Sequence, residues 1–147
     1  MDILENNKKK ELKNREIELK NLQLPDVLGS KKLRSSDITK IVKNTNISLF
    51  DKKECCLWTG YITRSKNNGS YINFYFKNKK KTALHRLLYA NFKGDLGEDY
   101  YIKYTCENKG ICCNINHMVK YKYDEKQAIN DTVISRYKPD DFKITIY

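Results

Sequence analysis

Apolar residues recur at helical spacing in the first part of the chain. Within residues 1–24, Leu12 and Leu19 share one stripe with Arg15 and Glu16, and most of the remaining positions are charged or polar. This pattern predicts a solvated helix of marginal stability. The sequence leaves open whether that helix lies on the rest of the protein, lies on a partner or frays.

Two shorter helices are predicted further along the chain. The first follows a linker at residues 25–35 and would be capped by Ser36 or Asp37. Its apolar face consists of three β-branched residues: Ile38, Ile41 and Val42. The second stops at Gly94, and its apolar face is formed by Leu84, Leu87, Leu88 and Phe92.

Strands are predicted on both sides of this last helix. Residues 70–76 are apolar and aromatic at successive positions, which suits a strand buried on both faces, and residues 78–81 suit a hairpin turn. Residues 100–104 predict a further strand that enters a cysteine-rich loop, and a final helix is expected to begin at Asp124. The mixture of helices and hairpins indicates an α+β fold.

The amino-acid composition indicates which kind of partner the protein binds and in which cellular compartment it acts. The 147 residues carry 29 Lys and Arg against 18 Asp and Glu, a net charge of +11, which favours polyanions. No apolar run is long enough for a membrane span and no signal peptide is visible, so we expect a reducing intracellular compartment, in a host cell or a virion. We divide the chain into a helical extension (1–49), a functional domain (50–135) and a tail (136–147).

Cysteines and one histidine are spaced as metal ligands. A short segment has the spacing C-x5-C-x4-H, in Cys106, Cys112 and His117. A tetrahedral zinc needs a fourth ligand, which the pair Cys55 and Cys56 offers. Cys113 also stands at a ligand spacing from the histidine. The alternative is that these cysteines are small buried apolar residues.

Three motifs together resemble the zinc-containing HNH homing endonucleases, also called His-Me finger nucleases. They are C-x-W-T-G at residues 56–60, A-x-H-R at 83–86 and C-x5-C-x-N-x-x-H-M at 106–118, within a similarity that covers residues 54–127. The resemblance implies a ββα-metal core with an antiparallel β-hairpin sheet. It also implies a structural zinc held by Cys56, Cys106, Cys112 and His117.

The chain departs from this family at both positions that carry the chemistry. Tyr104 stands where the family has its catalytic histidine, and Lys126 stands where the family has the asparagine or histidine that holds Mg²⁺. A tyrosine with a pKa near 10 is a poor base at neutral pH, and an ammonium group repels a divalent cation. The resemblance therefore implies a DNA-binding protein derived from a nuclease and without its activity.

Contacts with double-stranded DNA are expected from the basic hairpin and from the A-x-H-R helix. The expected residues are Arg64, Lys66, Asn68, Asn73, Lys77, Lys79, Lys80, Lys81, His85 and Arg86. The alternative is that the basic side chains of the hairpin are exposed to solvent and contact no nucleic acid. The choice between DNA and RNA and the formation of a homodimer stay open, and the richness in Lys, Asn and Ile indicates an A/T-rich, viral type of genome.

Two other functions remain open from the sequence. An active, Mg²⁺-dependent nuclease would use Tyr104 or His85 as its base, and Asn130 or Asp124 for the metal. A structural or interaction subunit of a larger nucleoprotein complex would bind a protein partner through residues 1–49.

Overall fold

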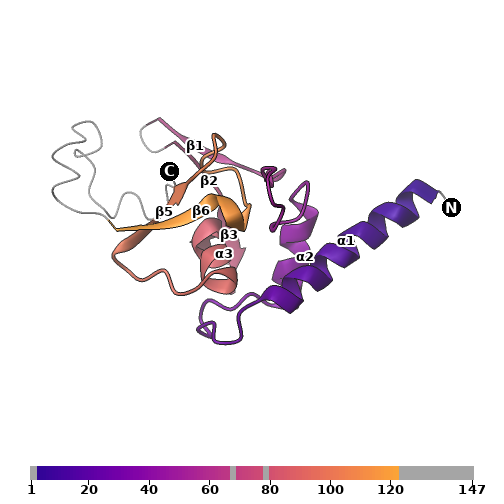
Figure 1. The fold of residues 1–147 in the computed structure, drawn as a ribbon, viewed down its shortest axis with the longest axis horizontal. Coiled ribbons are helices and arrows are strands. Elements are labelled where there is room, and N and C mark those ends of the chain that lie inside the picture. The colour runs from indigo at the N-terminus through magenta and orange to yellow at the C-terminus, as the bar shows by residue number, and fades with distance from the viewer. Residues whose placement is uncertain (1–2, 67–68, 78–79, 123–147) are drawn as a thin grey trace.

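The computed structural model describes residues 3–66, 69–77 and 80–122 of the chain (Figure 1). The three α-helices are α1 (Ile3–Leu22), α2 (Ser35–Lys43) and α3 (Leu84–Phe92). The strands are β1 (Thr63–Ser65), β2 (Gly69–Tyr71), β3 (Asn73–Phe76), β4 (Lys80–Ala83), β5 (Tyr100–Tyr104) and β6 (Met118–Lys122). They form three antiparallel hairpins, β1–β2, β3–β4 and β5–β6, so the described part of the chain has a mixed α+β fold.

Helix α1 packs on α2 through the stripe that the sequence predicts, and its amino-terminal half extends beyond the body (Figure 1). Leu19 is buried, and the Arg15 guanidinium donates to the carbonyls of Thr45 and Ile47 at 3.3 and 3.0 Å. Those carbonyls belong to the segment that follows α2, so the two bonds attach α1 to that segment. The predicted helix therefore exists and lies on the rest of the protein.

The segment predicted as a linker is packed against α3. Leu33 is buried, and its backbone N–H donates to the side-chain oxygen of Asn91 at 3.0 Å. The Asn91 amide also donates to the carbonyl of Lys31, and the Gln23 side chain donates to Asn91. Because Asn91 is completely buried, these bonds fix the segment to the body.

The strand predicted over residues 70–76 is instead two strands of different hairpins, separated at Ile72. Phe74 and Phe76 face the core, whereas Tyr75 between them is 51% exposed. Strand β3 thus alternates between buried and exposed side chains, so the prediction of burial on both faces is wrong. The physical reason is that nothing in the described part of the chain forms a second layer over the outer face of the β3–β4 hairpin at Tyr75.

The β5–β6 hairpin carries the candidate site in its connection. Strand β5 has the predicted bounds, and its register pairs Tyr104 with Met118 and Tyr100 with Lys122. The connecting residues 105–117 hold the cysteine-rich loop. The helix predicted from Asp124 and the tail at 136–147 lie outside the described residues, so the ββα core stays a prediction.

One hydrophobic core joins the helical extension to the rest of the chain. It includes Leu19 and Ile41 from the first two helices together with Trp58, Phe74 and Leu88. Because α1 and α2 share this core with the rest of the chain, their packing helps to position the site. In the described part of the chain, no helix combines the length and apolar character needed to cross a membrane.

Candidate metal centre and nucleic-acid interface

Four side chains of types that can bind a metal meet between the β5–β6 connection and the loop that precedes Trp58. They are Cys55, Cys106, Cys112 and His117, and their ligand atoms all lie within 4.8 Å of one another. The Nδ1 atom of His117 lies 3.4 Å from Sγ of Cys112 and 3.7 Å from Sγ of Cys55. Three residues come from one short loop, and the fourth ties the start of the domain to it.

These separations fit a tetrahedral metal ion. Zinc binds sulfur at about 2.3 Å and nitrogen at about 2.0 to 2.1 Å, which places the two ligand atoms about 3.6 Å apart in a tetrahedron. The observed 3.4 and 3.7 Å bracket that value. Burial raises the pKa of the Cys106 and Cys112 thiols above the ordinary value, and a bound cation would favour their thiolate forms instead.

The fourth member of the cluster is Cys55, and not Cys56 as the resemblance implies. The Cys56 side chain is completely buried in the core, its thiol donates to the carbonyl of Ile47 at 3.2 Å, and burial raises its pKa to about 11. Successive side chains of an extended segment point to opposite sides. Because Cys56 faces the core, Cys55 faces the loop. Cys113 is also completely buried and lies outside the cluster.

Asn114 joins the two loops that carry the cluster. It is part of the C-x5-C-x-N-x-x-H-M motif, but the sequence assigned it no role. Its completely buried side chain donates to the carbonyls of Asp51 and Glu54 at 2.9 and 2.7 Å. Its side-chain oxygen accepts from the backbone N–H of Asn116 at 2.8 Å, and its own N–H points to Sγ of Cys112 at 3.4 Å. One amide therefore sets the loop of Cys55 against the loop of the other three ligands.

Tyr104 and His85, the two candidate bases, are both enclosed in the core. Tyr104 is 4% exposed, and burial raises its pKa well above the ordinary value. His85 is 0% exposed, its Nε2 lies 2.8 Å from the carbonyl of Cys112, and burial lowers its pKa to about 4. A base must reach the proton that it abstracts, directly or through one water. Neither ring faces solvent in this structure.

The A-x-H-R residues do not present their side chains as expected for DNA contacts. His85 is buried, and Arg86 is half-buried with its guanidinium on the carbonyls of Tyr100 and Gly97 at 2.9 and 3.1 Å. The prediction that His85 contacts DNA is therefore wrong. The physical reason is the apolar face of α3, which places His85 in the core beside Leu84 and Leu88.

The hairpin residues are divided between two hairpins. Arg64 and Lys66 are exposed at β1 and the turn after it, and Asn73 donates to the Thr63 hydroxyl at 3.5 Å. Lys77 donates to the carbonyl of Gly29, so its ammonium is directed toward the body. Asn68, Lys79 and Lys126 lie outside the described residues, as does the side chain of Lys80.

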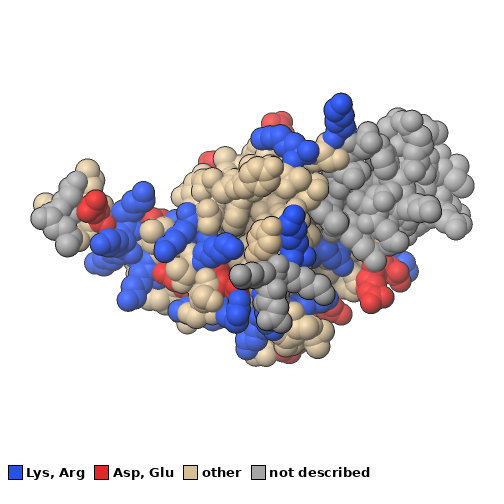
Figure 2. Space-filling model, turned by 180° about the vertical axis from the view of Figure 1, so that it is seen from behind, with Lys and Arg blue, Asp and Glu red and all other residues tan. Residues whose placement is uncertain are grey.

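The exposed Tyr75 of β3 has two lysine ammonium groups near its ring. The ammonium groups of Lys40 and Lys81 lie 6.0 and 5.9 Å from the ring centroid of Tyr75. Both lysines are exposed, and Lys40 comes from α2, which the sequence analysis did not connect with this hairpin. We call Lys40, Tyr75 and Lys81 the basic–aromatic face. Figure 2 shows basic side chains gathered along α1 and over the adjoining body.

The chain is similar to a viral protein. Uncharacterized protein R328 of Acanthamoeba polyphaga mimivirus is 53% identical to it over 114 residues, which make up 76% of this chain and 33% of that protein. The chain therefore spans about a third of the length of this relative. No protein-family model matches the chain, and no solved structure matches it. The resemblance to HNH nucleases stays a prediction.

Proposed function

We propose that this protein is a zinc-stabilised DNA-binding protein without nuclease activity, on a fold related to the HNH nucleases and acting inside a host cell or a virion. The observation that carries the proposal is the basic–aromatic face, in which an exposed tyrosine of β3 lies near one lysine of β4 and one lysine of α2. The net charge of +11 supports a polyanionic partner. The mimivirus relative supports the viral setting.

Zinc is the metal that the donor set favours. Three thiolates and one imidazole are soft or borderline ligands, which suit zinc better than magnesium or calcium. Four protein ligands leave no open coordination position, so the ion would act in folding and not in catalysis. Removing it with a strong chelator should lower the melting temperature of the protein, and restoring zinc should recover it.

We infer that the protein lacks nuclease activity because both candidate bases, Tyr104 and His85, are buried. The Tyr104 hydroxyl would have to lose a proton whose pKa is raised by burial. His85 is neutral and has the correct charge for a base, but its ring lies wholly inside the protein. Neither residue can take a proton from a water molecule held on a DNA phosphate without opening the core.

The described hairpins suit the contacts that DNA offers. A two-stranded ribbon fits the major groove, where lysine and arginine reach phosphates or guanine edges. The exposed cations described on or beside the two hairpins are Arg64, Lys66, Lys40 and Lys81. If these four each neutralise one phosphate, affinity falls by about 100-fold between 50 and 200 mM salt.

The test is equilibrium binding of the zinc-loaded protein to a labelled DNA duplex over a series of salt concentrations. Lys81→Ala should weaken binding and reduce the salt slope by about one unit. The matched control is Lys109→Ala, which removes an equally exposed lysine from the metal-binding loop. It should leave the slope unchanged. A flat salt response of the wild type, or equal effects of the two variants, would contradict the proposal.

A second candidate function is that of an interaction subunit, and the exposed apolar residues of α1 favour it. Ile3 and Leu4 are each 74% exposed, and Ile17 and Leu22 are 48% and 46% exposed. Such residues suit a helical partner surface. Capture of a protein partner at high salt, together with no binding to duplex DNA, would favour this function over DNA binding.

A further inference from the structure

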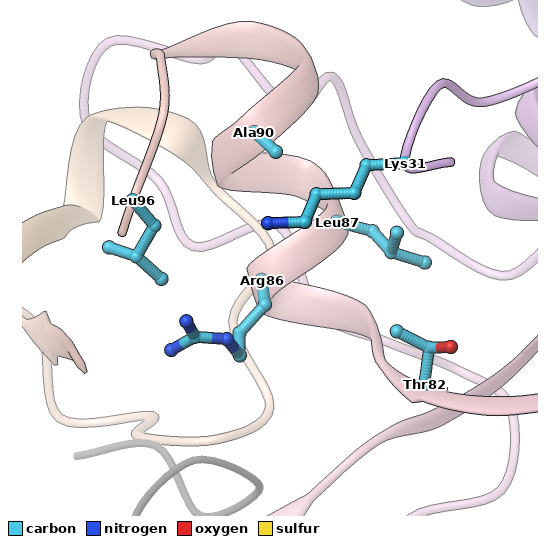
Figure 3. Close-up of a pocket in the computed structure, with 6 residues that line it drawn as sticks. All are labelled: Lys31, Thr82, Arg86, Leu87, Ala90 and Leu96. Carbon is cyan, nitrogen blue, oxygen red and sulfur yellow. The ribbon is translucent and has the colours of Figure 1, made fainter. Parts of the chain in front are cut away.

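A small cavity of about 100 Å³ lies beside α3, on the side where Arg86 leaves the helix. Figure 3 shows the Lys31 ammonium and the Arg86 guanidinium on the same side of α3, with Leu96 facing them. The lining residues are Lys31, Thr82, Arg86, Leu87, Ala90 and Leu96. Its lining thus has two cations and, among the residues that the structure describes, no carboxylate.

Arg86 is held in place without an acidic partner. Its two terminal nitrogens donate to the carbonyls of Tyr100 and Gly97 at 2.9 and 3.1 Å. A guanidinium has five N–H groups, so these two bonds fix its orientation and leave further donors for a ligand. Burial lowers the pKa of Arg86, as expected for a half-buried cation.

The Lys31 backbone is fixed by the buried amide of Asn91. The Asn91 side chain donates to the Lys31 carbonyl at 2.9 Å and to the Leu87 carbonyl at 2.8 Å. Lys31 itself donates its backbone N–H to Leu28 at 2.8 Å. A buried side chain therefore positions the Lys31 segment over α3 in advance of any ligand, which lowers the entropic cost of binding.

Among the described residues, neither cation has a carboxylate at ion-pair distance, although Asp26 and Asp95 line a neighbouring cavity together with Lys31. Among the residues that the structure describes, the ion pairs within 4.0 Å are Arg15–Glu11 and Arg34–Asp37, and neither includes Lys31 or Arg86. Two positive charges that are partly removed from water repel each other, and an anion bound between them adds an attraction to each that offsets the repulsion.

We infer that this cavity binds one phosphate-sized oxyanion, held by Lys31 and Arg86. The cavity is small, about 100 Å³, which favours a single phosphate group over a larger ligand. The inference does not rest on the proposed function. Free phosphate, the phosphate of a small metabolite and one backbone phosphate of DNA share the chemistry that it requires.

The test is titration of the metal-loaded full chain with inorganic phosphate at constant ionic strength, followed by calorimetry or amide chemical shifts. The wild type should show saturable binding, and Lys31→Ala should weaken it by about 10- to 100-fold. Lys31 is the residue to change because Arg86→Ala would leave two carbonyls without donors. The matched control is Lys32→Ala, whose exposed lysine does not line the cavity and should change binding by less than about twofold.

Absence of saturable phosphate binding by the wild type, or equal binding by Lys31→Ala, would overturn the inference. Two further results would support it and assign the source of the ligand. If phosphate displaces a DNA duplex, and Lys31→Ala weakens duplex binding more than Lys32→Ala does, the ligand is a DNA phosphate. If phosphate binds but duplex binding is unchanged or absent, the ligand is a free or metabolite phosphate.

Discussion

His85 and Tyr104 pack edge to face, with their ring centroids 5.2 Å apart and their planes at 89°. The Tyr104 hydroxyl and Nδ1 of His85 are both buried without a hydrogen-bond partner in the described structure. The position that the resemblance assigns to a catalytic histidine is thus filled by a ring that packs. A buried polar atom without a partner costs free energy, which makes this pair a testable part of the account.

Tyr104→Phe should leave stability unchanged or raise it by about 1 kcal/mol, because it removes a hydroxyl that is desolvated without a partner and keeps the ring. Chemical denaturation of the metal-loaded protein measures this difference. A loss of more than about 1 kcal/mol would mean that the hydroxyl has a hydrogen-bond partner in solution.

Stability should fall as the pH decreases from about 6.5 toward 4, because of His85. Its pKa is about 4 in the folded protein and near 6.5 when unfolded, so between these values the unfolded state binds the proton more strongly. The stabilisation is complete above the unfolded pKa, is lost as pH falls, and amounts to about 3 kcal/mol. Nitrogen NMR of the ring tests the cause: His85 should remain neutral at pH 5.

Cys55→Ser should lower metal affinity by orders of magnitude, because one of four ligands is lost. Cys56→Ser should keep one metal ion per chain and lose about 1 to 2 kcal/mol of stability, because a buried thiol becomes a hydroxyl. Cobalt substitution provides the measurement, since the visible spectrum reports a tetrahedral site rich in sulfur. Retention of that spectrum by Cys55→Ser and its loss in Cys56→Ser would restore the ligand set implied by the resemblance.

The choice between these neighbouring cysteines shows where sequence reasoning reached its limit. The spacing of Cys106, Cys112 and His117 predicted a cluster because three ligands lie within one loop. The identity of the fourth ligand depends on whether Cys55 or Cys56 faces the core. Packing against residues far away in the sequence decides which of the two does so. A spacing pattern carries no information on it.

The same contrast applies to the fold. Helix α3 was predicted because its apolar stripe and Gly94 lie within a dozen residues. Strand β6 was not, because the alternation of apolar and basic residues in its sequence covers only residues 119–122, directly after the cysteine-rich loop. Its pairing with β5 is a contact between segments on either side of the cysteine-rich loop. The approach of Lys40 to Tyr75 is likewise a tertiary contact, between α2 and β3.

Asn114→Ala should destabilise the protein by about 2 to 4 kcal/mol, since it leaves the Glu54 carbonyl without its donor and removes one of the two side-chain donors to the Asp51 carbonyl. The matched control is Asn116→Ala. Its exposed side chain also donates to Asp51, at 3.0 Å, and its loss should cost less than about 1 kcal/mol. Thermal unfolding with zinc in excess compares the two. Equal losses would remove the special role of Asn114 as the link between the two loops.

The central claim, DNA binding without cleavage, is tested most directly on supercoiled plasmid with the zinc-loaded protein, in Mg²⁺ and in EDTA. The account predicts retardation of the plasmid in both conditions and no nicked product in either. Nicking that requires Mg²⁺ and is lost in His85→Ala, while that variant still binds zinc and the plasmid, would contradict it. Such a result would make the protein an active nuclease with His85 as its base.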